Sequence, residues 1–132
     1  MNRTGGAMNW TDETLRQFGK SIGIEGLGFN TRNVCCLSLK ESGELYIEKK
    51  DDLVFVYLAR RLPRISEKAL EKALSLTHFR NPWPLPVSSG LRDDDHLIFI
   101  TWIATEDFSL PVLDEAIRLV MSLHQQVQNQ ES

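Results

Sequence analysis

The sequence predicts one α+β domain in the order helix, three antiparallel strands, helix, one or two further strands, helix. Three observations support this fold class. Three segments begin with the capping residues and apolar spacing that are typical of helix starts. Runs of apolar and β-branched residues are separated by tight turns, which favours antiparallel pairing. The length of 132 residues suits a single domain with its own core.

The first helix is predicted over residues 10–22, with Thr11 as its cap and Gly23 ending it in the left-handed region. Residues 24–30 follow as a glycine-rich loop that still carries three apolar residues. Such residues either pack beneath the loop or form an exposed docking surface. The sequence leaves both alternatives open.

Three strands are predicted over residues 34–39, 45–49 and 53–59. Residues 42–43 and 51–52 supply the turns between them, which favours an antiparallel meander. The second strand alternates apolar with polar residues, as a half-buried strand does. The third is apolar on both faces, which places it near the centre of the sheet.

The second helix begins at Ser66, and its small residues at close spacing would allow another helix to approach closely, as at a dimer seam. Packing on the chain's own sheet is an equal alternative. Residues 81–86, with the sequence NPWPLP, cannot be helical because three prolines enforce an extended backbone. Val87 is expected to begin a short edge strand, and residues 88–95 a polar loop.

The last strand is predicted over residues 96–103 and is apolar on both faces. Both of its faces therefore need cover, one from the chain's own helices and the other from a second chain. Ser109 caps the helix that follows. Its apolar stripe is predicted to contain Leu113, Ala116, Ile117, Val120, Met121, His124 and Val127.

The predicted domain covers residues 8–127. Residues 1–7 are expected to be a disordered lead, with Met8 as an alternative start to Met1, and residues 128–132 a frayed tail. No apolar run is long enough to span a bilayer, so no integral membrane association is expected. The net charge of −3 argues against a nucleic-acid partner.

No group of residues has the spacing of a catalytic, cofactor or metal site, so the sequence predicts a protein that is not an enzyme and has no cofactor. The three histidines lie on different predicted elements, and His124 is expected in the core or at its rim. Cys35 and Cys36 are adjacent, which is the wrong spacing for zinc or redox motifs and for an intrachain disulfide. A reducing, cytosolic setting fits these free thiols.

Several stretches carry a resemblance to a known family. Residues 15–29, LRQFGKSIGIEGLGF, look like the opening of class I type III secretion chaperones, whose first helix ends near a similar glycine and is followed by a short apolar loop. The resemblance is strongest to the SycN-like branch. It also rests on residues 8–10 (MNW), 58–62 (LARRL), 72–77 (KALSLT), 97–100 (LIFI) and 109–113 (SLPVL). Residues 1–7 and 81–86 depart from that pattern.

The resemblance implies the secretion-chaperone fold and a dimer that holds the N-terminal segment of a secreted client in extended form, without ATP or chemistry. It further implies a YscB-like chaperone as heterodimer partner, with a homodimer as the alternative, and a YopN-type gatekeeper as client. The expected location is the bacterial cytoplasm, with peripheral association at the inner membrane beside the secretion apparatus as a further option.

An extended client can add to a sheet edge or lay apolar side chains into grooves between helix and sheet. The expected client groove consists of Phe18, Ile22, Leu27, Phe29, Leu37, Leu39, Leu45 and Ile47. By analogy with the family, the expected dimer interface consists of Ala69, Leu70, Ala73, Leu74, Leu85 and Val87. Ordinary core packing is the alternative for each of these residues. An adaptor that holds a folded partner, or a small-molecule-binding α+β domain, is the competing function.

Overall fold

The computed structural model describes residues 10–62, 64–78 and 80–131. Its helices are α1 (Trp10–Ser21), α2 (Glu67–Leu76) and α3 (Leu110–Glu131), with a short 3₁₀ turn, η1 (Thr105–Asp107). Its strands are β2 (Val34–Leu39), β3 (Gly43–Lys50), β4 (Leu53–Arg61), β5 (Val87–Arg92) and β6 (His96–Ala104). The predicted α+β order is therefore confirmed, with two strands between α2 and α3.

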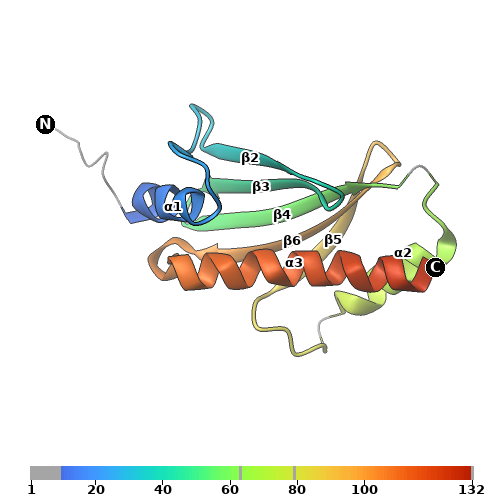
Figure 1. The fold of residues 1–132 in the computed structure, drawn as a ribbon. Coiled ribbons are helices and arrows are strands. Elements are labelled where there is room, and N and C mark those ends of the chain that lie inside the picture. The colour runs from blue at the N-terminus through green and yellow to red at the C-terminus, as the bar shows by residue number, and fades with distance from the viewer. Residues whose placement is uncertain (1–9, 63, 79, 132) are drawn as a thin grey trace, which may run out of the picture.

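The five strands form one antiparallel sheet in the order β2-β3-β4-β6-β5 (Figure 1). Strand β4 lies in the middle, as its two apolar faces predicted. Strands β2 and β5 form the two edges. The long helix α3 runs along the sheet, α1 lies near the β2 edge and α2 near the β5 edge.

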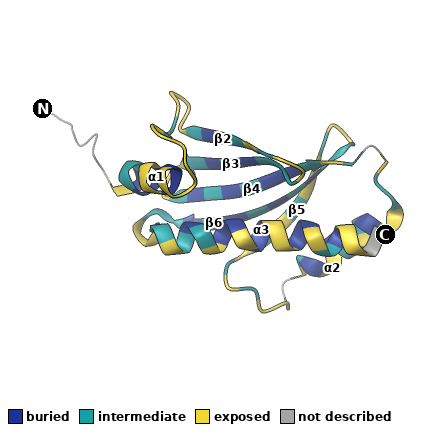
Figure 2. Ribbon diagram, viewed as in Figure 1, coloured by how far each residue is buried: buried dark blue, intermediate teal, exposed yellow. Residues whose placement is uncertain are grey.

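All three helices pack on the same face of the sheet and share one core with it. Alternate residues of the central strands point into this core, and those between them stay half-buried on the opposite face (Figure 2). The buried residues of β4 and β6 are Val54, Val56, Leu58, Ala59, Leu97, Phe99, Thr101 and Ile103. The molecule is thus a two-layer structure with one sheet face open.

Helix α3 buries a wider stripe than the sequence predicted, because it packs against the sheet on one side and against α2 on another. Leu119 and Leu123, which lie outside the predicted stripe, are buried, whereas Met121 is exposed. The helix also continues to Glu131, so residues 128–131 are helical, and fraying of the tail at residues 128–132 stays a prediction.

Two further predictions need correction, and two end signals are confirmed. Thr11 lies inside α1, where its buried hydroxyl accepts a hydrogen bond from Lys49 Nζ at 3.2 Å, and does not cap the helix. Residues 88–92, expected in a polar loop, form most of β5.

Ser66 caps α2 by accepting from Ala69 N, and Gly23 adopts the predicted positive φ. The lead at residues 1–7 and Met8 lie outside the described residues.

Candidate binding surfaces

The first candidate surface is formed at the β2 end of the sheet by the end of α1 and the loop that follows it. The loop folds back on the helix, with Ile24 N donating to Gly19 O at 2.7 Å. Gly19 is needed there, because a Cβ at this position would lie 2.6 Å from Leu27 Cβ. The missing side chain of Gly19 therefore allows the apolar loop to lie directly against the helix.

Five of the eight predicted client-binding residues have side chains that this subunit leaves at least partly accessible to solvent. Ile22 is exposed at 46%, and the others are half-buried and packed on the edge of the core. They are Leu27, Phe29, Leu37 and Leu39. Lys49 Nζ lies 5.2 Å from the centre of the Phe29 ring, which places a cation beside this aromatic side chain. These side chains combine apolar contact area with partial access to solvent.

The other three predicted client-binding residues lie inside the core of this subunit. Phe18 is 7% exposed, and Leu45 and Ile47 are 1% exposed each. The inward face of β3 is covered by the chain's own helices, so these side chains are not open to a client here. The alternation of apolar and polar residues along β3 correctly indicates which face of the strand is apolar. It does not show that the helices of this same chain cover that face.

The second candidate surface lies at the β5 end, where α2 approaches the sheet. Leu74 on α2 is 67% exposed, and Leu91 on β5 is 48% exposed. With Leu70 they line a shallow, mainly apolar groove of about 200 Å³. Exposed leucines around such a groove are typical of a protein–protein contact.

The residues of the predicted dimer interface fall into two groups, those buried inside the subunit and those at least partly exposed. Ala69 and Ala73 are buried inside the subunit, where α2 packs on α3, so their small size allows an approach within this chain. Leu70, Leu85 and Val87 are half-buried, and only Leu74 of the six is fully exposed. The predicted interface does not include Leu91, because the sequence predicts a polar loop over residues 88–95. The spacing of four between Val87 and Leu91 is the signal that places both residues on one face of a strand.

The open sheet face carries a cluster of half-buried aromatic side chains. Tyr46 and Tyr57 stack with their ring centres 4.9 Å apart, and Arg92 Nη1 donates to Tyr46 Oη at 3.2 Å. Burial and the nearby carboxylate of Glu48, which accepts from the phenol at 3.1 Å, raise the pKa of Tyr57 to about 12. This hydroxyl therefore remains a proton donor at neutral pH. Cover of this face by a second chain stays a prediction.

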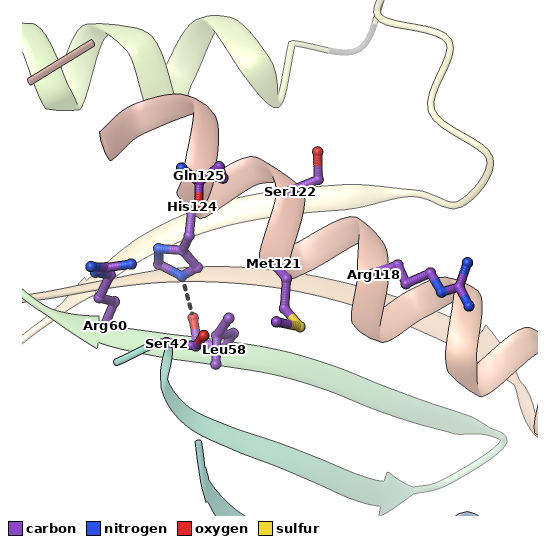
Figure 3. A pocket seen from close by; sticks show the side chains of 8 residues that line it. All are labelled: Ser42, Leu58, Arg60, Arg118, Met121, Ser122, His124 and Gln125. Carbon is purple, nitrogen blue, oxygen red and sulfur yellow. Dashed lines mark hydrogen bonds between the residues drawn. The ribbon is translucent and has the colours of Figure 1, made fainter. Parts of the chain in front are cut away.

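A third feature is a cleft of about 310 Å³ between α3 and the β3–β4 side of the sheet (Figure 3). His124 lies buried at its floor and shares a hydrogen bond of 2.7 Å between Nε2 and Leu58 O. Burial lowers the pKa of this ring to about 4, against the smaller opposite effect of the Leu58 carbonyl. The ring is thus neutral at pH 7 and donates its Nε2 proton to the Leu58 carbonyl. This hydrogen bond connects α3 to the centre of β4.

Metal-ligating side chains do not gather in the described part of the chain. Within those residues no three His, Cys, Asp or Glu side chains gather as a metal site would require. Cys35 is buried and Cys36 exposed, on opposite faces of β2, and both are free thiols. None of the described helices is long and apolar enough to cross a membrane.

Comparisons with known proteins agree with this geometry. A family model for the type III secretory system chaperone SycN matches residues 10–128. The chaperone protein SycN of Yersinia enterocolitica is 26% identical over 121 residues, which cover 91% of this chain and 98% of the relative. SycN of Yersinia pseudotuberculosis gives the same identity and coverage.

Solved structures show the same fold. The HopA1–SchA chaperone–effector complex matches with a TM-score of 0.69 at 15% identity, covering 98% of this chain and 99% of the other. The ExsC–ExsE complex gives a TM-score of 0.72 at 11% identity, covering 86% of each chain. The Yersinia pestis type III secretion chaperone SycH, in complex with a fragment of YscM2, gives 0.67 at 12% identity, covering 90% and 98%.

Proposed function

Because this chain belongs to the SycN family of type III secretory system chaperones, we propose that it acts as a dimer and holds the N-terminal segment of a secreted client in extended form. The observation that carries the proposal is the family match over residues 10–128, nearly the whole described chain. This family is a class of chaperones and not of enzymes.

The proposed client surface is the β2 end of the sheet. An extended polypeptide needs backbone partners and pockets for alternate side chains. Strand β2 is an edge strand that carries Leu37 and Leu39. The segment between α1 and β2 carries the other three residues of the proposed groove, Ile22, Leu27 and Phe29. Phe18, Leu45 and Ile47 are left out of the proposed groove because the subunit buries them in its own core.

The proposed dimer surface is the β5 end. Leu74 and Leu91 expose apolar area beside the groove that Leu70 also lines, and a second chaperone subunit would remove this area from water. Leu85 and Val87 extend the same end of the sheet. Ala69 and Ala73 do not contact the partner in this proposal. Their small side chains let α2 pack closely on α3, which positions α2 for the dimer contact.

The partner we propose is a YscB-like chaperone, with a second copy of this chain as the alternative, and the client is a YopN-type gatekeeper. The structural neighbours that contain a chaperone with a secreted protein or a fragment support a polypeptide client. The complex would act in the bacterial cytoplasm, with peripheral association at the inner membrane beside the secretion apparatus.

Co-expression with the products of neighbouring genes, followed by sizing and identification of the co-purifying chains, tests the proposal. We expect a dimer that captures a secreted protein and loses it when the N-terminal segment of that protein is deleted. A monomer that captures no secreted polypeptide would contradict the proposal. Capture that survives the deletion would instead identify an adaptor for a folded partner.

A further inference from the structure

The outer edge of β2 offers its hydrogen-bonding groups at alternate residues only. Lys49 N donates to Asn33 O at 2.9 Å, so the carbonyl of Asn33 faces β3, while its N–H donates to Asn30 O at 2.9 Å. In an antiparallel pair, successive residues direct their N–H and C=O groups to opposite sides. The backbone groups of Val34, Cys36 and Ser38 therefore point away from the sheet, toward any strand that joins this edge.

Asn30 occupies the first of these three positions. Its side-chain Oδ1 accepts from Val34 N at 3.1 Å, and its backbone N donates to Val34 O at 2.9 Å. Both outward groups of Val34 are thus satisfied within the chain. The same Oδ1 also accepts from Arg32 N at 2.8 Å, which fixes the side chain in this position.

At the C-terminal end of β2, the turn into β3 ends the edge that an incoming strand could pair with. Lys40 O accepts from Ser42 N at 2.7 Å, and the chain then reverses at Gly43. Between the Asn30 cap and this turn, Cys36 and Ser38 are the two β2 residues whose outward N–H and C=O groups can pair with an incoming strand.

We propose that Asn30 sets the register of the client strand on β2. Because Asn30 already binds the outward N–H and C=O groups of Val34, the client pairs with Cys36 and Ser38 alone. This inference rests on the proposed function, since it requires an extended client at this edge. Without such a stop, a strand can slide along an edge in steps of two residues while keeping the same side chains inward. Asn30 is therefore a positioning residue for the client.

The occupant that fits is an extended polypeptide segment with apolar residues at every second position. Client residues paired with Cys36 and Ser38 share the open face of the sheet with those side chains. The residue between them, and those on either side, face the helix layer beside Leu37 and Leu39, which are half-buried and apolar. The client segment thus alternates apolar residues with residues that tolerate solvent.

The exposed thiol of Cys36 provides a direct measurement of the register. The probe is the N-terminal segment of the YopN-type protein of the same bacterium, with single cysteines at consecutive positions, bound to the assembled full-length chaperone. Dibromobimane, which bridges neighbouring thiols, then reports which client residue lies opposite Cys36. We expect one predominant position in the unaltered chaperone and no product after Cys36→Ser.

Asn30→Ala removes the side-chain acceptor and frees the N–H of Val34. We expect a second cross-linked position two residues along the client, with a yield within about fivefold of the first, since the gain is one hydrogen bond. Asn30→Asp is the matched control, because its carboxylate still accepts from both N–H groups. It should keep the single position.

Two results would overturn the inference in distinguishable ways. If the unaltered chaperone binds the segment but cross-links at several positions, the client site stands and the register stop does not. If Asn30→Ala, checked for an unchanged melting curve, keeps the single position, Asn30 does not set the register. If the segment does not bind at all, the proposed client site fails, and this inference fails with it.

Discussion

The two ends of the sheet present apolar surface in different ways. At the β2 end, apolar side chains such as Leu27 and Phe29 are half-buried on the loop after α1, and the edge strand β2 has outward backbone groups. At the β5 end, Leu74 and Leu91 project from a helix and a strand into solvent. The first arrangement suits an extended chain that pairs through its backbone, and the second suits a folded surface that packs side chain against side chain.

The strongest test of this difference uses neighbouring residues on α2. Ala73 is 2% exposed and packed inside the subunit, so Ala73→Glu forces a large, charged side chain into a filled core. We expect the free energy of unfolding to fall by about 3–5 kcal/mol, measured by urea denaturation at low protein concentration. An unchanged midpoint together with loss of assembly would place Ala73 at the seam between subunits.

Leu74→Glu is the matched variant on the exposed side of the same helix. It should leave the unfolding of the subunit within about 0.5 kcal/mol and weaken dimerisation about a hundredfold, because the interface would bury an unpaired charge where a leucine had packed. Sedimentation velocity measures the second effect. Ser122→Glu, on the exposed side of α3, is the control that should dimerise normally. A dimer unaffected by Leu74→Glu would exclude this face as the seam.

At the other end, Ile22→Ser should weaken client binding about tenfold and leave dimerisation unchanged. The expected loss follows from one isoleucine side chain that is no longer buried by the client. A fluorescence titration with the labelled N-terminal segment of the client measures it, and Leu74→Ser serves as the opposite control. If Leu74→Ser weakens the client and Ile22→Ser does not, the two ends have been assigned the wrong way round.

A prediction about subunit stability concerns the centre of the sheet, where His124 on α3 shares a hydrogen bond with Leu58 O on β4. The pKa of the ring is about 4 in the folded subunit, chiefly because it is buried, against an ordinary value of 6.5 in the unfolded chain. As the pH falls below 6.5 the unfolded chain takes up a proton that the folded chain does not, so stability is complete above pH 6.5 and declines toward pH 4.

Between pH 7 and pH 5 we expect His124 to account for a loss of about 2 kcal/mol in the free energy of unfolding. Urea denaturation at each pH measures it. His124→Gln has no titrating ring and retains a side-chain donor for Leu58 O, so its stability should vary less over this range. Equal pH dependence in the two proteins would show that other groups are responsible.

The order of elements and most of their ends were predictable because local signals determine them. The cap at Ser66, the glycine at residue 23 and the turn at residues 51–52 each act through the backbone nearby, and the structure contains all three. Strand β5 was not predictable from composition. It is an edge strand of small and polar residues, held through backbone pairing with β6.

The division of apolar residues between core and surface was less predictable. The alternation of β3 shows that Leu45 and Ile47 share a face, but not whether a helix of this chain or a client covers it. Likewise, the small residues of α2 indicate a close helix contact without naming the partner, which the structure identifies as α3. Such questions depend on how the elements pack in three dimensions, and no local pattern encodes the answer.

The central claim is that the two ends of the sheet bind different partners. Amide hydrogen exchange of the assembled chaperone, measured with and without the N-terminal client segment, tests it most directly. The account predicts slower exchange at Cys36 and Ser38 on adding the client, with residues 67–76 and 87–92 unchanged because the dimer already protects them. Protection that appears at residues 67–76 or 87–92, and not on β2, would contradict it.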